Sequence, residues 1–242
     1  GTRFGPLSRT ARPKQFLQFG QSQSLLQATA ERCQPLIPGA QMWVVTNALQ
    51  ASETRRQLPT VPAAQVLVEP QGRNTAPCVG LAAARLVHQD PDAVMGLMPA
   101  DHVIGPFEAF RARLAAAVDL VQADAQRLVL FGVAPTYPAT GFGYIERGEP
   151  LTSAGAYQVE SFREKPDHDT AAGYLHAGRY FWNCGIFVWS ARTILALLQR
   201  FEPEMYDGLM RIATAFDTPG EEETLNREFP LLKSISIDYA VL

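Results

Sequence analysis

Short apolar runs rich in β-branched residues recur along the chain and alternate with segments of helical periodicity. The runs expected to form strands are 42–46, 66–69, 94–98, 128–133 and 181–189. Because strands separated by helices favour parallel pairing, the pattern predicts an α/β fold with a mostly parallel central sheet flanked by helices. Ligands of such sheets bind at the carboxyl ends of the strands.

Three helices are expected between these strands. Ser24 can cap a helix with a single apolar stripe, at positions 25, 26, 29, 33 and 36. Thr75 can start a second helix that continues to residue 87, and a third occupies 107–121. From 135 to 166 the chain is rich in Gly, Pro and aromatic residues, which indicates an antiparallel insertion or a sugar-binding lobe on the same core.

Length and composition favour one domain. The 242 residues are 47% hydrophobic and 19% charged, which is ordinary for a globular chain. We expect a single domain over 1–242, with a nucleotide-binding half at about 1–134 and a sugar-phosphate-binding half at about 135–242. No apolar run approaches the ~20 residues that cross a bilayer. Three separated cysteines, without a C-x-x-C pair, indicate neither disulfides nor zinc, so we expect a cytoplasmic protein.

The charge is unevenly distributed. Residues 1–30 contain four basic side chains and no acidic one, a local charge of +4; subtracting it from the total of −3 leaves −7 for the remainder. This balance disfavours nucleic acid as a partner and favours a small anion at the N-terminus. Neither a Walker A loop nor a G-x-G-x-x-G motif occurs. Glycines and arginines near the start can cradle phosphates, although a solvated basic terminus would look the same.

Two segments that follow expected strands carry further chemistry. Arg73 can meet a phosphate, Asn74 can pair with a base edge, and Thr75 can serve the first turn of its helix. A capped turn with an exposed arginine is the plainer explanation. Asp101 follows the strand at 94–98 and Pro99, where one carboxylate suits Mg²⁺ bound to substrate phosphates. An Asx turn or a helix cap is the commoner role of such a residue.

The second half carries a smaller set of candidates. Glu164 and Lys165 are an adjacent acid and base, which ordinarily form only a surface pair. Asn183 interrupts an aromatic strand, where an amide needs a partner, either a ligand or the backbone. We assign no role to His102 and expect Cys184 to be a small packing residue.

Seven segments carry a resemblance in a fixed order. They are G-T-R-F-G-P-L-S-R-T-A-R-P-K at 1–14, E-P-Q-G-R-N-T-A-P at 69–77, M-P-A-D-H at 98–102, T-G-F-G-Y-I at 140–145, F-R-E-K-P at 162–166, F-W-N-C-G at 181–185 and S-I-D-Y-A-V at 236–241. Together they resemble the motifs of mannose-1-phosphate guanylyltransferases, also called GDP-mannose pyrophosphorylases. The resemblance implies the Rossmann-like fold of nucleotide-diphospho-sugar transferases and the conversion of GTP and mannose 1-phosphate to GDP-mannose and diphosphate.

The resemblance also implies site residues. For the nucleotide they are Gly1, Thr2, Arg3, Lys14, Glu69, Arg73, Asn74, Thr75, Ala76, Pro99 and Asp101. For the sugar phosphate they are Gly143, Tyr144, Glu164, Lys165 and Asn183. The catalytic residues implied are Arg3, Lys14, Asp101 and Lys165. Asp101 would bind Mg²⁺, and Phe142 with its neighbours would close over the sugar. Arg163 departs from the family motif, in which valine is frequent.

The family pattern extends past both printed ends. A strand with L-A-G-G precedes G-T-R, and a later G-W-x-D-V-G-S-W segment supplies the second metal carboxylate, so we expect a fragment. Two alternatives stay open: a sugar-1-phosphate nucleotidyltransferase with another base or sugar, and a non-catalytic module that binds a nucleotide sugar. A homodimer is compatible with the sequence, which gives no oligomeric state.

Overall fold

The computed structural model describes residues 13–18, 22–151 and 155–242. The helices of these residues are α1 (Leu25–Cys33), α2 (Ala48–Gln57), α3 (Thr75–Gln89), α4 (Phe107–Ala123), α5 (His168–Ala177), α6 (Ala191–Phe201), α7 (Pro203–Ala213), α8 (Glu221–Glu228) and α9 (Ile237–Val241). The strands are β1 (Val44–Asn47), β2 (Val66–Glu69), β3 (Val94–Leu97), β4 (Val129–Val133), β5 (Gly143–Pro150), β6 (Tyr157–Glu164) and β7 (Tyr180–Ser190). Short 3-10 helices occupy η2 (Lys14–Phe16), η3 (Gly39–Gln41), η4 (Ala63–Gln65) and η5 (Phe229–Leu231).

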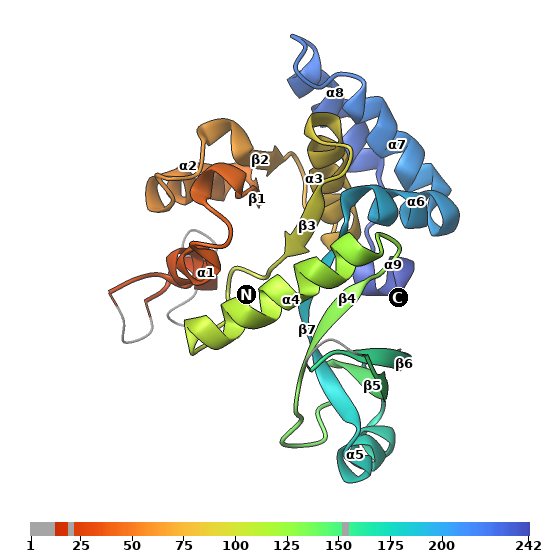
Figure 1. Cartoon of the computed structure of the whole chain (residues 1–242). Coiled ribbons are helices and arrows are strands. Elements are labelled where there is room, and N and C mark those ends of the chain that lie inside the picture. Colours follow the sequence, from red (N-terminus) through yellow and green to blue (C-terminus); the bar gives the residue numbers. More distant parts are fainter. Residues whose placement is uncertain (1–12, 19–21, 152–154) are drawn as a thin grey trace.

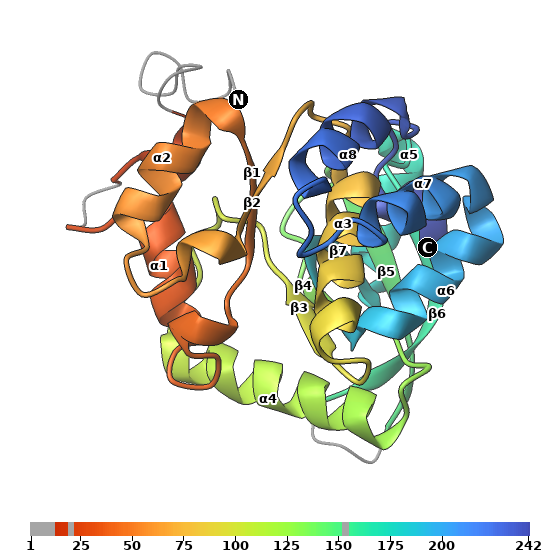
Figure 2. The ribbon, with the colours of Figure 1, turned by 90° about the horizontal axis from the view of Figure 1, so that it is seen from above.

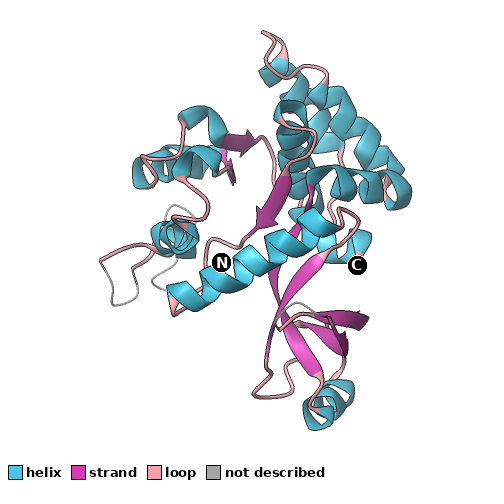
Figure 3. Cartoon of the chain, viewed as in Figure 1, coloured by secondary structure: helices cyan, strands magenta, loops and turns pink. Residues whose placement is uncertain are grey.

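These elements form two groups and a smaller lobe. Figure 1 shows α1, α2, β1 and β2 on one side and α3, α6, α7 and α8 on the other. The lobe contains β5, β6 and α5 and lies at one end of β7. The view in Figure 2 shows that α4 extends across both groups. Figure 3, coloured by secondary structure, also shows the strands with helices beside them.

The strands belong to two sheets. β1 and β2 pair in parallel, with Asn47 opposite Glu69 at their carboxyl ends. The five-stranded sheet has the order β3-β7-β5-β6, with β4 also paired to β7. Both β3 and β4 are antiparallel to β7, so these two strands share one direction. The α/β class expected from the sequence is confirmed, and the parallel pair within it is β1 with β2.

β7 is long enough to pair with two strands along the same edge. Residues 187–190 pair with β3, whereas residues 180–182 pair with β5. β4 pairs with the opposite edge over most of this length, from Trp182 to Val188. Residues 183–186 therefore lie between the end of β3 and the start of β5, and this interval contains Asn183. The expected antiparallel insertion is the β5–β6 hairpin, which completes the lobe.

The largest hydrophobic cluster lies between the sheet and the helices α3, α6 and α7. Gly80 of α3 permits this close approach, because a Cβ there would lie 2.3 Å from Leu209 Cδ1 and 3.1 Å from Leu198 Cδ1. Both leucines are fully buried. Among the described helices, none combines the length and apolar character needed to cross a lipid bilayer.

The expected helices are present, with one difference in detail. Ser24 caps α1 in a full capping box with Gln27. α1 ends at Cys33, before Pro35, which cannot donate a helical hydrogen bond. The expectation that Leu36 continues the apolar stripe is therefore wrong: it lies beyond the helix and is 41% exposed. α3 begins at Thr75, as expected, and its N-cap is Asn74.

Truncation of Leu198 tests the packing of α6 on α3. Leu198→Ala removes a fully buried side chain at the contact with Gly80, and we expect a loss of about 2–5 kcal/mol in unfolding free energy. Urea titration followed by circular dichroism measures it. The matched control is Leu231→Ala, at a leucine that is 74% exposed, where a change within about 0.5 kcal/mol is expected. Equal effects of the two substitutions would contradict this assignment of the core.

Candidate active site

Asp101 lies just beyond the carboxyl end of β3 and forms an ion pair with Lys14. The side chains are 17% and 34% exposed, so water screens the pair only in part. His102 Nε2 lies 3.9 Å from Asp101 Oδ1. Burial lowers the pKa of His102, and the neighbouring Arg32 and Lys14 lower it further. The carboxylate thus has a basic group near each of its oxygens.

Glu69 ends β2 and faces a polar cavity of about 150 Å³. Gln15, Gln50 and Ala100 also line this cavity, and Gln15 donates to Gln50 over 2.7 Å. Within the described residues, Glu69 Oε2 is buried and accepts no hydrogen bond. Burial raises the pKa of this carboxyl. A buried acceptor without a partner is costly, so the cavity suits a ligand with N–H or O–H donors.

The loop before α3 is attached to the C-terminal part of the chain. Asn74 has a positive φ of 67°, and its side-chain oxygen accepts from the Thr75 amide at 2.8 Å. The Thr75 hydroxyl accepts from the Ile237 amide at 2.8 Å. Ala76 is fully buried, and its amide donates to the Ile235 carbonyl over 3.0 Å.

Arg73 belongs to the same attachment. Its guanidinium donates to the Pro230 carbonyl, whereas its Nε is buried and has no hydrogen-bond partner within the described residues. Of the residues expected to contact the nucleotide here, Asn74 and Thr75 are exposed and Ala76 is not.

The lobe brings Glu164 and Lys165 to the end of β6. Lys165 Nζ lies 3.0 Å from Glu164 Oε1, and the two side chains are 54% and 14% exposed. Glu164 raises the pKa of Lys165, first by hydrogen bonding and then by its charge. A Cβ at Gly143 would lie 2.5 Å from Glu164 Oε2, so this glycine makes room for the carboxylate. Tyr144 is fully buried, and its hydroxyl donates to the Ala139 carbonyl, which places its side chain inside the lobe.

Both the oxygen and the nitrogen of the Asn183 side-chain amide form hydrogen bonds. Its oxygen accepts from the Gly185 amide at 3.1 Å, and its nitrogen donates to Asp238 Oδ1 at 2.8 Å. Asp238 lies on α9, and burial together with the charge of Glu164 raises its pKa. Asn183 was expected from the sequence, but Asp238 was not, although it lies in the quoted segment at 236–241. A carboxylate between two apolar residues of that segment was the signal available.

One contact joins the residues around Asp101 to those around Asn183. Gly185 has a φ of 69°, and a Cβ there would lie 3.5 Å from Pro99 Cγ. Gly185 is two residues from Asn183, and Pro99 is two residues from Asp101. The chain after β3 therefore lies against the interval of β7 that no strand covers on that edge. The segments that carry Asp101 and Asn183 are therefore neighbours in the fold.

The remaining expectations concern residues at the start of the chain and the binding of a metal. Gly1, Thr2 and Arg3 lie outside the described residues. Within the described chain, no three His, Cys, Asp or Glu side chains form a cluster that could hold a metal ion. Asp101 offers one carboxylate, which fits an ion that takes its other ligands from water and substrate phosphates.

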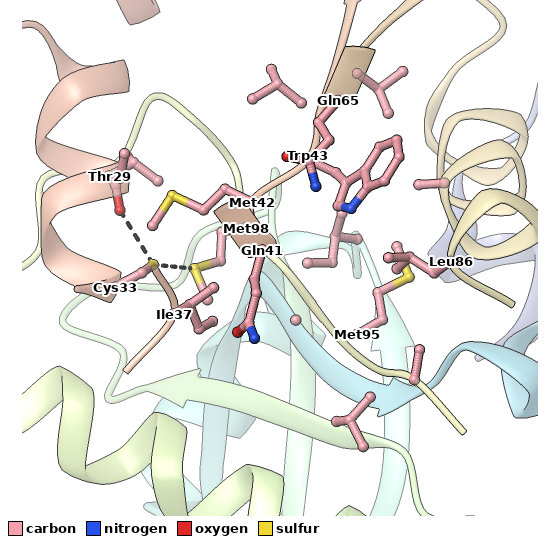
Figure 4. A pocket seen from close by; sticks show the side chains of 18 of the residues that line it. Thr29, Cys33, Ile37, Gln41, Met42, Trp43, Gln65, Leu86, Met95 and Met98 are labelled. Carbon is pink, nitrogen blue, oxygen red and sulfur yellow. Dashed lines mark hydrogen bonds between the residues drawn. The ribbon is translucent and has the colours of Figure 1, made fainter. Parts of the chain in front are cut away.

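A larger cavity, of about 670 Å³, lies between β1 and β3. Figure 4 shows its apolar side chains together with Cys33, whose thiol lies 3.3 Å from the Thr29 carbonyl and 3.1 Å from Met98 Sδ. Its described lining contains no Lys, Arg or His. Burial raises the pKa of Cys78 in this lining to about 12. Such a lining resembles a sheet interior and offers nothing to a polyphosphate.

Fold and site together define an α/β protein in which lysine–carboxylate pairs meet at the ends of strands, as suits phosphorylated ligands. The family model described as "Nucleotidyl transferase" matches residues 1–220, and the chain belongs to that family. The chain is 40% identical over 245 residues to xanthan biosynthesis protein XanB of Xanthomonas campestris pv. campestris (strain ATCC 33913), covering 100% of this chain and 51% of that protein.

Two further similarities point the same way. A mannose-1-phosphate guanylyltransferase of Escherichia coli is 36% identical over 248 residues, covering 100% of this chain and 52% of the relative. A crystal structure described as mannose-1-phosphate geranyltransferase from Thermus thermophilus superposes with a TM-score of 0.84 at 33% identity, covering 98% of this chain and 66% of that chain. The chain spans about half the length of the curated relatives it matches.

The buried carboxyl of Glu69 predicts a measurable pH dependence of stability. Because its folded-state pKa is raised, the native protein keeps this proton to higher pH than the unfolded chain does. The stability that Glu69 contributes is complete below the ordinary Glu pKa of about 4.3 and is lost as pH rises through the raised value. We expect Glu69→Gln to unfold at a higher temperature than the wild type at pH 7, with the difference shrinking toward pH 4.

Differential scanning calorimetry at a series of pH values measures this effect. The matched control is Glu223→Gln, at an exposed acid of α8, which should leave the profile unchanged. A stabilisation by Glu69→Gln that is confined to acid pH would mean that the folded-state pKa of Glu69 is lowered rather than raised.

Proposed function

We propose that the chain is the catalytic part of a mannose-1-phosphate guanylyltransferase, which joins GTP and mannose 1-phosphate to give GDP-mannose and diphosphate. The observation that carries the proposal is that the contact of Gly185 with Pro99 places the segments of two charged groups of residues side by side. One group contains Lys14 and Asp101, and the other contains Glu164, Lys165 and Asn183. The guanylyltransferase name of the relative from E. coli supports the choice of substrates.

The nucleotide has its proposed place beside Glu69 and Lys14. The guanine edge carries N–H donors, and the buried Glu69 oxygen is an acceptor that no described residue satisfies. Lys14 meets the triphosphate, and Asn74 and Thr75 are exposed at the start of α3. Arg3 and its neighbours, implied by resemblance, belong to the same phosphate-binding segment in this proposal.

The sugar phosphate has its proposed place between the lobe and β7. Lys165 meets its phosphate, whereas Glu164 and Asn183 meet ring hydroxyls. The reaction forms a bond between a phosphate oxygen of the sugar phosphate and the α-phosphorus of GTP, and it breaks the α–β phosphoanhydride bond. The attacking oxygen is already anionic, so no side chain has to remove a proton. The residues hold two mutually repelling anions in line and spread their charge.

A divalent metal ion is part of the proposal. Nucleotidyltransferases generally use one, and Mg²⁺ would be held here by Asp101. When bound, it would neutralise charge on the nucleotide phosphates. Lys14 is paired with the same carboxylate, so it would be released toward the phosphates.

The proposed protein acts in water without a membrane or nucleic acid as a partner, and a homodimer is compatible with the proposal.

Diphosphate release tests the proposed function. The full-length protein is assayed with GTP, ATP, UTP and dTTP, each combined with mannose 1-phosphate, glucose 1-phosphate and N-acetylglucosamine 1-phosphate. We expect the highest kcat/KM for GTP with mannose 1-phosphate and no turnover once EDTA removes the divalent ion. A preference for another pair favours the alternative nucleotidyltransferase, and GDP-mannose binding without turnover of any pair favours the non-catalytic module.

Substitution of Lys165 tests whether the second half of the chain binds the sugar phosphate rather than GTP. The chain has three lysines, at 14, 165 and 233. Lys165→Gln should raise KM for the sugar phosphate by about 10- to 100-fold, because a charge-assisted contact to phosphate is lost, and leave KM for GTP nearly unchanged. Lys233→Gln removes an exposed lysine paired with Glu202 and is the matched control. Unchanged sugar-phosphate kinetics in Lys165→Gln would remove this residue from the site.

A further inference from the structure

Asp238 is the acidic residue nearest to the proposed sugar site for which the sequence suggested no role. Its Oδ1 accepts from Asn183 Nδ2 at 2.8 Å. Glu164 and Lys165, at the end of β6, are close enough to act on the pKa of Asp238, which the charge of Glu164 raises and that of Lys165 lowers. The ring of Tyr239, the next residue on α9, lies 5.8 Å from Lys165 Nζ. Three elements of the chain therefore meet at this carboxylate.

α9 holds Asp238 firmly in position. Ile237 and Ala240 on either side are 1% and 5% exposed and belong to the main hydrophobic cluster. The Ile237 amide donates to the Thr75 hydroxyl, and the Ile235 carbonyl accepts from the Ala76 amide. Side chains whose surroundings are fixed in this way lose little freedom when they bind a ligand.

The hydrogen bonds of Asn183 limit what it can do alone. Its oxygen accepts from Gly185, and one of its two amide hydrogens goes to Asp238. One amide hydrogen remains, and the amide can therefore donate to a ligand through that hydrogen only. A sugar hydroxyl both donates and accepts, and the Asn183 oxygen, which already accepts from Gly185, has one acceptor position left. A carboxylate beside the amide is a stronger acceptor for such a hydroxyl, because it is charged. The Asp238 carboxylate is such an acceptor, because two oxygens provide about four acceptor positions.

Charge decides which part of the substrate the carboxylate faces. A phosphate close to Asp238 and Glu164 would be repelled, whereas Lys165 attracts it. The phosphate therefore belongs on the Lys165 side and the hydroxyls on the side of the two acids. We propose that Asp238 is a specificity-determining residue of the sugar site, where it fixes the Asn183 amide and accepts a hydrogen bond from one hexose hydroxyl. This inference rests on the function proposed above.

Deoxy sugars test the contact directly. The full-length wild type is assayed with GTP and with mannose 1-phosphate or its 2-, 3-, 4- and 6-deoxy analogues. A hydrogen bond to a charged acceptor predicts a loss of roughly 10- to 100-fold in kcat/KM for the analogue that lacks the contacted hydroxyl. In Asp238→Asn, mannose 1-phosphate should lose a similar factor, and that same analogue should lose little more. KM for GTP should stay within about 2-fold.

The controls separate this role from a merely structural one. Asp119→Asn removes an exposed carboxylate of α4 and should leave all constants unchanged. If Asp238→Asn fails to fold by circular dichroism, Asp238→Ser replaces it. The inference is overturned if the variant shows the same deoxy penalties as the wild type, or if KM for GTP rises as much as KM for the sugar. A wild type inactive with every substrate pair overturns the proposed function, and the inference falls with it.

Discussion

The pairing of β7 with three other strands fixes the geometry on which the rest of the molecule depends. One end of β7 is held by β3 and β4 and lies against α4. The other end is held by β4 and β5 and carries the lobe. Because ladder hydrogen bonds set both registers, the interval at 183–186 cannot shift relative to the end of β3. Residues from distant parts of the sequence therefore come together around this interval without any one loop having to place them all.

α9 complements this constraint from the other side. Its short helix is stabilised by burial of Ile237 and Ala240 rather than by its length, since an isolated five-residue helix is not stable. The same helix binds the start of α3 through Thr75 and contacts β7 through Asn183. The loop proposed to meet the nucleotide and the strand proposed to meet the sugar thus share one support. Displacement of α9 would affect both substrates, whereas loss of the Asp238 carboxylate alone should affect the sugar.

The sequence predicted those elements that have a local signal. Apolar runs gave β2 at its observed bounds and β1, β3, β4 and β7 within about two residues at either end, and the cap at Ser24 placed α1. The helices α2 and α5 to α9 were not predicted, although α6 and α7 each present a clear apolar stripe to the core. The antiparallel pairing of β7 with β3 and β4 depends on contacts between residues 49 to 96 positions apart. The hydrophobic pattern of a sequence carries no information about such distant contacts. The interval of β7 around Asn183 could therefore be recognised only in the folded chain.

The same distinction applies to the site: single residues could be expected from the sequence, whereas contacts between distant segments could not. Asp101, Glu164 and Lys165 were expected as individual groups, but the ion pair of Asp101 with Lys14 joins segments 87 residues apart and emerged only from the structure. Both lysines are held by carboxylates before any substrate arrives. An ion pair in partial contact with water contributes little stability, so each lysine can exchange its carboxylate for a phosphate at modest cost. Holding the lysines in this way orients them in advance while leaving them available. The arrangement favours anions that offer more charge than a single carboxylate, and a triphosphate and a phosphomonoester both do so.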